Sequence, residues 1–295
     1  MSANPPVMLR KAVLPAAGFG TRFLPIAKAV PKEMLPIGDK PVIHYVVEEA
    51  VAAGFTDILI VVSRDKSAIV DYFDRAPELE TRLRASGRDE QADELVRIAN
   101  QARFHFIRQG EMKGLGDAVL RARGHVGEEP FALLLADTVI VDGQDRPGKP
   151  NALEALSAAR RETGFSAVAV EPVSADRVCR YGVVGGEESA PGLFVLDAMV
   201  EKPSPAEAPS VRLLSGETAS GGWAFAARYL LNPGIFRHLE KTRPGKNGEI
   251  QLTDAMAALM VEEGFCGCRL PGRRLDIGNP AGLIEANRRI LALPA

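Results

Sequence analysis

A glycine-rich segment, PAAGFGTRFLPIAKAVPKEMLPI, follows the first apolar run of the chain. The backbone N–H groups of Gly18 and Gly20 and the hydroxyl of Thr21 can donate hydrogen bonds to phosphate oxygens. Arg22 and Lys32 add positive charge close by. The segment therefore predicts a loop that binds a triphosphate. The alternative is that the glycines only allow a tight turn and that the cations only keep the surface soluble.

The loop matches neither of the two common phosphate-binding motifs. A dinucleotide fingerprint has the form G-x-G-x-x-G, and this chain has Phe23 where the third glycine belongs. A Walker A loop has lysine directly followed by serine or threonine, and no G-K-[ST] occurs in this region. The loop alone leaves the phosphate chemistry open.

Two carboxylates are placed where a metal ion could be held. Asp137 follows the apolar run FALLLA, which predicts a central strand, and Asp276 in RRLDIGNP occupies a similar strand-end position. Ligands of open α/β sheets bind beyond the carboxyl ends of the strands, and a carboxylate there can hold Mg²⁺ against phosphates. The alternative for both residues is a cap on the turn that follows.

Glu201 and Lys202 form a third candidate group, which Pro203 terminates. Successive side chains of a regular strand point to opposite faces, but at an irregular strand end both can reach one ligand. A carboxylate accepts hydrogen bonds from sugar hydroxyls, and an ammonium group binds phosphate. The alternative is a pair of ordinary surface charges.

The elements that must position these residues alternate between short apolar runs and helical patterns. The expected strands are KAVLPA, DILIVVS, RFHFIRQ and FALLLAD, and the expected helices between them are PVIHYVVEEAVAAG, SAIVDYFD and LGDAVLRAR. This alternation is typical of parallel strands joined by helices. We expect an α/β, Rossmann-like fold whose mostly parallel mixed sheet is flanked by helices.

The second half of the chain is less regular. SAVAVEPV, YGVVGG and GLFVLDAMVEKP predict strands, AEAPSVRLLSGETASGGW resembles a loop, and GEIQLTDAMAALMVEEG and NPAGLIEANRRILAL predict amphipathic helices. The charged stretch 78–101 predicts an exposed helical insertion broken near Gly87. Because no internal repeat or long linker divides the chain, we expect one domain over 1–295.

Composition excludes several functional classes. The formal net charge of −2 over 295 residues gives no basic excess for a nucleic-acid partner. The three cysteines, Cys179, Cys266 and Cys268, contain no C-x-x-C pair, which argues against a disulfide framework and a zinc set. The N-terminus lacks the apolar core of a signal peptide, and no run is long enough to span a membrane. We expect a cytoplasmic protein without membrane partners.

The order of the motifs resembles the sugar-1-phosphate nucleotidyltransferases, and among them the uridylyltransferases that act on glucose 1-phosphate. The resemblance runs from about residue 9 to about residue 290. It is carried by AAGFGTRFLP, PKEMLPIGDKPVI, RQGEMKGLGDAV, LLLADT, YGVV, VEKP, GEIQLTDA and DIGNP, in the family's order. It implies a GT-A-type fold with a nucleotide-binding half at about 9–140 and a half for the sugar phosphate at about 141–295.

The resemblance implies a set of site residues. The nucleotide site would comprise Ala16, Ala17, Gly18, Gly20, Thr21, Arg22, Lys32, Gln109 and Gly114, with Gln109 and Gly114 on the base. Gly182, Glu201 and Lys202 would bind the sugar phosphate, and Asp137 and Asp276 would hold Mg²⁺. The catalytic groups would be Arg22, Lys32, Asp137 and Lys202.

The implied reaction converts UTP and glucose 1-phosphate into UDP-glucose and pyrophosphate. A phosphate oxygen of the sugar phosphate attacks the α-phosphorus in line, so no side-chain nucleophile is needed. The four histidines, His44, His105, His125 and His238, match none of the implied positions, and we expect them to be structural. We also expect a homo-oligomer, a dimer or a tetramer.

Two departures and three alternatives remain. The usual Leu-Pro-Asp of the metal strand is Leu-Ala-Asp here, and Ala227 stands where a glycine is expected, after a segment at 211–227 that is longer than usual. The far wall of the sugar pocket is therefore open to question. The alternatives are a thymidylyltransferase or another member of the family, a regulatory homologue that binds sugar nucleotides without turnover, and more remotely a Rossmann oxidoreductase.

Overall fold

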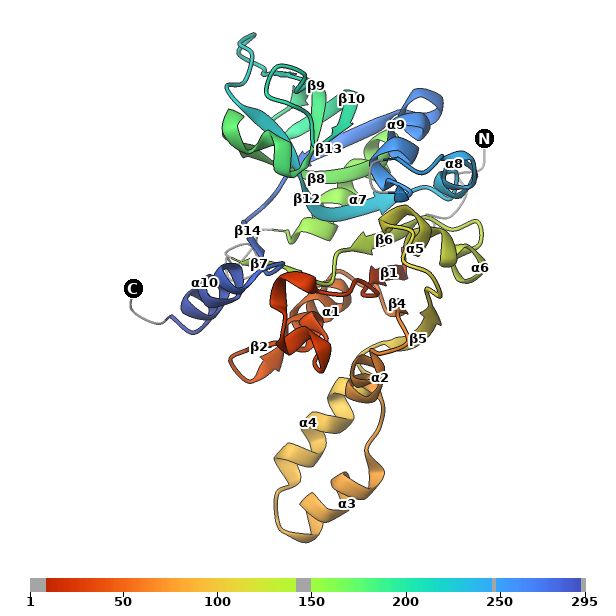
Figure 1. The fold of residues 1–295 in the computed structure, drawn as a ribbon, viewed down its shortest axis with the longest axis vertical. Coiled ribbons are helices and arrows are strands. Elements are labelled where there is room, and N and C mark those ends of the chain that lie inside the picture. Colours follow the sequence, from red (N-terminus) through yellow and green to blue (C-terminus); the bar gives the residue numbers. More distant parts are fainter. Residues whose placement is uncertain (1–8, 142–149, 246–247, 293–295) are drawn as a thin grey trace.

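The computed structural model describes residues 9–141, 150–245 and 248–292. Ten of the described strands form one mixed sheet in the order β11-β9-β10-β13-β8-β12-β6-β1-β4-β5 (Figure 1). The predicted α/β class with a central mixed sheet is therefore confirmed.

The first half of the chain builds the parallel part of the sheet. Its strands are β1 (Lys11–Pro15), β4 (Asp57–Val62), β5 (Arg103–Arg108) and β6 (Phe131–Leu134). All of their mutual pairings are parallel, so their carboxyl ends lie at one edge. The residues of β4 after its first are buried on both faces, which explains the unbroken apolar run that predicted this strand.

The second half adds strands that pair mainly antiparallel. They are β8 (Ser166–Val173), β9 (Gly182–Ala190), β10 (Leu193–Glu201), β11 (Val211–Arg212), β12 (Gly222–Leu231) and β13 (Phe265–Arg269). Strand β12 pairs antiparallel with β6 and β8 and so joins the two halves. The parallel character that the sequence predicted is concentrated in the first half of the chain.

Helices cover both faces of this sheet. On one face lie α1 (Val42–Ala52), α2 (Ser67–Phe73) and α7 (Ala152–Thr163), whose side chains share a core with Leu14 and Ile60. On the other lie α5 (Leu115–Arg121), α6 (Arg123–Val126), α8 (Ile235–Lys241) and α9 (Leu252–Glu263), which share a core with Val13 and Leu59. Alternate residues of β1 and β4 thus face opposite cores, as the pleat requires.

A small second sheet brings distant parts of the chain together beside the main one. Strand β7 (Thr138–Val141) pairs antiparallel with β14 (Arg273–Asp276), and α10 (Pro280–Ile290) packs on them. In the pairing register Asp276 stands opposite Thr138. Asp276 therefore lies next to the turn that carries Asp137.

The glycine-rich loop is made of short turns. It contains the 3-10 helices Thr21–Phe23, Ile26–Lys28 and Lys32–Met34 and is followed by the two-residue strands β2 (Pro36–Ile37) and β3 (Lys40–Pro41). A fourth 3-10 helix, Ala175–Arg180, precedes β9. The loop begins directly after β1, at the carboxyl edge of the parallel strands.

Helices α3 (Pro77–Ala85) and α4 (Asp89–Asn100) form a hairpin that projects from the body beyond α2 (Figure 1). Gly87 lies between them with φ of 73°, a left-handed conformation that glycine adopts without a Cβ penalty. The predicted exposed helical insertion broken near Gly87 is confirmed.

Several elements were not predicted from the sequence. Strand β12 was not predicted, and its first residues were placed in a loop, although they lie in the middle of the sheet. Helices α7 and α8 and strands β7 and β13 were also not predicted, whereas the strand that ends at Asp276 is present as β14. Within the described ranges, no helix combines the length and the apolar character needed to cross a membrane.

Candidate active site

Two cavities meet at the carboxyl edge of the parallel strands. The first, of about 360 Å³, lies over the glycine-rich loop, and the second, of about 300 Å³, lies between the ends of β9, β10 and β12 and the start of α9. Both are of the size that small-molecule sites occupy. Their linings share Leu115, Leu135, Asp137 and Glu249. Asp137 is thus placed to act on ligands in both cavities.

The predicted loop residues mostly line the first cavity. Ala17, Gly18, Gly20 and Thr21 belong to its lining. Gly20 has φ of 65°, and a Cβ there would lie 3.3 Å from Lys32 Cβ, so the close approach of the loop to Lys32 favours glycine. Ala16 is buried instead, and its N–H donates to the carbonyl of Val61, which anchors the loop on β4.

Lys32 and Asp137 form an ion pair in the first cavity, with 2.5 Å between Nζ and Oδ2. Burial favours the neutral forms of both groups, but the opposite charge and the hydrogen bond between them outweigh it. The pKa of Asp137 is therefore lowered and the pKa of Lys32 is raised. Both groups are charged at neutral pH, as a site for phosphates and a cation requires.

A second ion pair lies behind the first. Lys66 Nζ is 2.6 Å from Glu33 Oε2, and both side chains are buried. Burial raises the pKa of Glu33 and lowers the pKa of Lys66. The pair ties the short helix that carries Lys32 to the start of α2, which fixes the base of the cavity.

The amide of Gln109 is held in one orientation. Its Nε2 donates to the carbonyl of Gly114 at 3.1 Å and to Asp117 Oδ2 at 2.8 Å. Asp117 is itself buried and accepts a further bond from Arg121. The reverse orientation would place Oε1 against two acceptors, so the carbonyl oxygen of Gln109 is the atom left free for a ligand.

Gly114 and Gly116 allow a close approach of the loop that follows β5 to a segment before α9. A Cβ on Gly114 would lie 2.8 Å from Glu249 Cβ, and one on Gly116 would lie 2.7 Å from the carbonyl oxygen of Ile250. The N–H of Gly116 donates to that carbonyl, and the N–H of Ile250 donates to the carbonyl of Lys113. The two segments close one side of the first cavity.

The predicted sugar-phosphate residues come together in the second cavity. Gly182, Glu201 and Lys202 all belong to its lining. Thr253 Oγ1 donates to Glu201 Oε2 at 2.6 Å and so fixes the carboxylate. A Cβ on Gly182 would lie 2.5 Å from the ring of Phe225 and 2.9 Å from Glu201 Oε2, so only glycine fits this position.

Lys202 projects from the strand end in an unusual backbone conformation. Its φ is 47°, in the left-handed region that non-glycine residues rarely adopt. Its side chain is 55% exposed, with Nζ 3.5 Å from Glu201 Oε1. Glu201 and Lys202 therefore face one cavity although they are adjacent in sequence, as expected for an irregular strand end.

Asp276 lies beside Asp137. The N–H of Ile277 donates to the carbonyl of Asp137 at 3.0 Å. A Cβ on Gly278 would lie 2.9 Å from Asp276 Oδ1 and 3.9 Å from Asp137 Oδ2, so the two carboxylates border one small space. Carboxylate oxygens are the donors that a hard divalent cation prefers, and the positive groups of Lys32 and Arg22 lie at the same place.

The alternative role for Asp137 and Asp276 was a cap on the turn that follows each of them. Asp137 precedes strand β7 rather than a helix, and the side-chain cap of α10 is Asn279. Asp276 Oδ1 does accept a hydrogen bond from the N–H of Gly278. Arg22 lines neither cavity, but its guanidinium approaches the same Gly278 position, at 3.2 Å from such a Cβ.

Ala227 has a backbone conformation that favours glycine, the residue that the family pattern led us to expect there. Its φ is 62°, it lies at a register irregularity of β12, and it forms part of the wall of the second cavity. Of the longer-than-usual segment at 211–227, Phe225 and Ala227 belong to the described lining of the second cavity, and no residue belongs to that of the first. The end of this segment therefore contributes to the wall of the sugar pocket.

The sequence analysis missed the residues that orient the site. Asp117 and Thr253 hold Gln109 and Glu201 in place, and Arg180 and Arg274 add positive charge to the second cavity. Asp117 and Thr253 stand inside quoted motifs, GLGDAV and GEIQLTDA, but nothing in the sequence shows which partner each one holds. Three-dimensional contacts were needed to find these roles.

Comparison with known proteins identifies relatives that match nearly the whole chain. The chain matches the model of the nucleotidyl transferase family over residues 11–292. It is 43% identical to a putative UTP–glucose-1-phosphate uridylyltransferase of Methanocaldococcus jannaschii, covering 96% of this chain and 93% of that protein. It is 44% identical to a UTP–glucose-1-phosphate uridylyltransferase of Bacillus subtilis, covering 96% and 89%.

A solved structure is also similar to this chain over nearly its whole length. A UDP-glucose pyrophosphorylase complexed with UDP-glucose superposes with a TM-score of 0.83 at 38% identity, covering 97% of this chain and 100% of that one.

Proposed function

The chain belongs to the nucleotidyl transferase family, and from this membership we propose that it makes UDP-glucose and pyrophosphate from UTP and glucose 1-phosphate. The observation that carries the proposal is the meeting of two cavities at Asp137. One cavity has a phosphate-binding loop and an oriented amide, and the other has a carboxylate and an ammonium group. Such a pair suits the joining of a nucleotide to a sugar phosphate.

In this proposal the nucleotide occupies the first cavity. The loop of Gly18, Gly20 and Thr21, together with Arg22, faces the phosphates, with Ala16 and Ala17 forming the loop's base. The carbonyl oxygen of Gln109 accepts the imide N–H of uracil, since its amide nitrogen is already engaged. The backbone of Gly114 completes the contact with the base.

The sugar phosphate occupies the second cavity. Glu201 accepts hydrogen bonds from glucose hydroxyls in the orientation that Thr253 imposes. The absence of a side chain at Gly182 lets Phe225 and Glu201 pack against it, and its backbone lines the cavity in which we place the sugar. Lys202 binds the phosphate, because its ammonium group is partly exposed and only loosely paired with Glu201.

The reaction then requires no protein nucleophile. A phosphate oxygen of glucose 1-phosphate attacks the α-phosphorus of UTP, a new P–O bond forms, and the bond to the β-phosphate oxygen breaks to release pyrophosphate. The attacking oxygen is already anionic, so no proton has to be removed. Catalysis rests on positioning and on neutralising charge, with Lys202 on the attacking phosphate and Lys32 and Arg22 on the departing phosphates.

We further propose that Asp137 and Asp276 hold Mg²⁺. When bound, such a cation neutralises the charge that builds up on the phosphates. The oxygen donors beside Gly278 fit it, as does the ionised state of Asp137. Without ligands, Lys32 balances the charge of Asp137, and the phosphates of the nucleotide would offer this ammonium group an alternative partner.

Three broader features remain proposals. We infer one domain in which the half at about 9–140 binds the nucleotide and the half at about 141–295 binds the sugar phosphate, supported by the linings of the two cavities. We infer a cytoplasmic location, supported by three free thiols. We also infer a homo-oligomer, a dimer or a tetramer, whose mass in solution light scattering would measure.

The function is tested by measuring pyrophosphate release from UTP, dTTP, CTP, ATP and GTP, each with glucose 1-phosphate and with other sugar 1-phosphates. We expect UTP with glucose 1-phosphate to give the highest kcat/KM. A higher value for dTTP would make the enzyme a thymidylyltransferase. Binding of UDP-glucose without any turnover would make it a regulatory homologue.

A further inference from the structure

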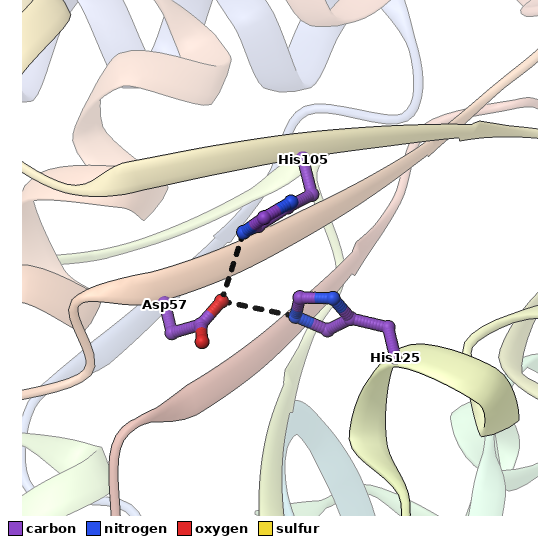
Figure 2. A group of neighbouring side chains, drawn as sticks. All are labelled: Asp57, His105 and His125. Carbon is purple, nitrogen blue, oxygen red and sulfur yellow. Dashed lines mark ion pairs between the residues drawn. The ribbon is translucent and has the colours of Figure 1, made fainter.

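Three side chains that take no part in the proposed reaction converge on one point (Figure 2). Asp57 begins β4, His105 comes from the neighbouring β5, and His125 comes from the short helix α6 that covers this face of the sheet. The substrate cavities lie at the opposite ends of these parallel strands. The cluster is therefore separate from the proposed active site.

The distances within the cluster match a set of ligands around one ion. Asp57 Oδ1 lies 3.0 Å from His125 Nε2 and 3.4 Å from His105 Nε2, and the three ligand atoms all lie within 4.8 Å of one another. Tetrahedral bonds of about 2.0–2.1 Å would place neighbouring ligand atoms roughly 3.3 Å apart. The side chains need only small adjustments to enclose an ion.

Two buried atoms of the cluster, Asp57 Oδ1 and His125 Nε2, are held by the 3.0 Å ion pair between them and by no hydrogen bond of good geometry within the described residues. Buried polar atoms are usually satisfied by well-formed hydrogen bonds. An ion at the centre would satisfy both atoms and would also engage His105.

The charge around the cluster is compatible with a cation. The positive charge of Lys11 acts on His125, but Lys11 Nζ lies 2.6 Å from Glu129 and donates to the carbonyls of His125 and Val126.

We propose that Asp57, His105 and His125 bind one transition-metal ion of the Zn²⁺ class, with Co²⁺ and Ni²⁺ as substitutes. Two imidazoles and one carboxylate suit these ions, whereas Mg²⁺ prefers an all-oxygen shell. The ion would join β4, β5 and α6. Because β5 leads into Gln109, and α5 and α6 follow its loop, the site would brace the frame of the base-binding loop.

The proposal is tested by titrating Co²⁺ into the metal-depleted, tag-free full-length protein in the presence of excess Mg²⁺. A histidine tag must be absent because it would bind the same ions. We expect one equivalent of Co²⁺ to produce the visible absorption bands of a low-coordinate site.

Variants locate the ion. His105→Gln, His125→Gln and Asp57→Asn should each weaken binding by at least about 10-fold, since even the loss of a ligand's outer hydrogen-bond partner costs about 10- to 100-fold. The control is His238→Gln, because His238 pairs with Glu262 and lies outside the cluster. Zn²⁺ should raise the melting temperature of the wild type and of this control, but not that of the cluster variants.

Two results would overturn the proposal. One is the absence of Co²⁺ bands from protein that is folded and active with Mg²⁺, in which case the cluster is a simple ion pair. The other is unchanged Co²⁺ binding in the variant that carries all three replacements. Melting temperatures measured in chelator show whether a variant has lost the ion or the fold. Because binding is measured without substrates, failure here is separate from failure of the proposed reaction.

Discussion

In the proposed function, the orientation of a single amide, that of Gln109, would determine which pyrimidine the first cavity accepts. Cytosine presents an acceptor at N3 where uracil presents a donor, so it would meet the carbonyl oxygen of Gln109 with the wrong polarity. Asp117 holds the amide nitrogen and so keeps the amide from turning over. We therefore propose Asp117 as a positioning residue for base selection.

We expect Asp117→Ala to lose selectivity more than activity. Sites that read a polar pattern can reject the wrong partner by as much as ~10⁴ in kcat/KM, and a free amide should reduce the preference for UTP over CTP by about 10- to 100-fold. Asp117→Asn is the matched control, because its side-chain oxygen still accepts from Gln109. The measurement is kcat/KM for both nucleotides, and equal preference in the wild type and Asp117→Ala would refute the role.

A second prediction at the residue scale concerns the effect of the Asp137 charge on turnover. Asp137→Asn keeps the shape of the side chain but removes a ligand for a divalent cation and the counter-ion of Lys32. We expect kcat to fall by about 10²-fold or more, as when a key electrostatic stabiliser is lost. Asp71→Asn, on the exposed side of α2, is the control. Near-normal kcat of Asp137→Asn at saturating Mg²⁺ would show that another group holds the metal.

Lys202 should act on only one of the two substrates. We expect Lys202→Ala to raise KM for glucose 1-phosphate by about 10- to 150-fold, the equivalent of a charge-assisted contact of roughly 1.5–3 kcal/mol. KM for UTP should change little, because Lys202 lines only the second cavity. Steady-state kinetics with each substrate varied in turn makes the comparison. The control is Lys241→Ala, which changes an exposed lysine at the end of α8. An equal loss for UTP would contradict the assignment.

At the scale of elements, a buried ion pair joins the two halves of the chain. Arg228 on β12 is completely buried and binds Glu49 on α1, with 2.7 Å between Nη2 and Oε2. It also donates to the carbonyl of Thr138, directly after Asp137. The pair therefore holds β12, α1 and the turn of Asp137 in one arrangement.

We expect Arg228→Met to reduce the free energy of unfolding by about 3–5 kcal/mol, because Glu49 would be left as an unpaired buried charge. The double variant that also carries Glu49→Leu should be more stable than Arg228→Met alone. Arg212→Met removes an exposed pair with Glu187 and should change stability by at most about 1 kcal/mol. Denaturant unfolding compares these variants with Glu49→Leu alone and with the wild type, and additive losses in the double variant would argue against the coupling.

The elements that could be predicted from the sequence are those whose hydrophobic pattern matches their surroundings. Strand β4 and helix α1 have such patterns, and both were found. Strand β12 was missed because it is buried on both sides, rich in alanine, contains a buried arginine and follows a run of glycines. Only its pairing with β6 and β8, which is a long-range property, identifies it as a central strand.

The same distinction applies to the site. Many residues that face the cavities could be named in advance, because loop glycines, strand-end carboxylates and the family's motif order indicate them, but Arg180 and Arg274 could not. The residues that hold them, such as Asp117 and Thr253, were not identified. Asp117 occupies a helical position that any polar residue could occupy, so the sequence gives no sign of a special role. Its contact with Gln109 depends on how the loop between β5 and α5 folds back. The proximity of Asp276 to Asp137 likewise depends on the pairing of β7 with β14.

At the scale of the whole molecule, we expect the ionisation of Glu48 to make the free energy of unfolding depend on pH in the acid range. Its carboxylate lies 2.9 Å from both His44 Nε2 and Lys40 Nζ, and these contacts, opposed by burial, lower its pKa to about 2. His44 is also bonded to Tyr72 through Nδ1. A lowered folded-state pKa stabilises the protein above the unfolded value of 4.5, and this stabilisation is lost as the pH falls from there towards 2.

We therefore expect the free energy of unfolding to decline over this pH window, and Glu48→Gln to decline less steeply. The measurement is denaturant unfolding at several pH values between neutrality and the acid limit. Glu90→Gln, on the exposed side of α4, is the control and should follow the wild type. Parallel curves for Glu48→Gln and the wild type would show that other carboxylates dominate the response.

The junction of the two cavities at Asp137 has a consequence for how such an enzyme can diversify. In the proposed function, the groups that would select the base come almost entirely from the first half of the chain, those that would select the sugar come mainly from the second, and Asp137 borders both cavities. A descendant could therefore exchange one sugar for another through changes around Gly182 and Glu201, and keep both its preferred nucleotide and its chemistry. A new nucleotide sugar would then require changes on only one side of this junction.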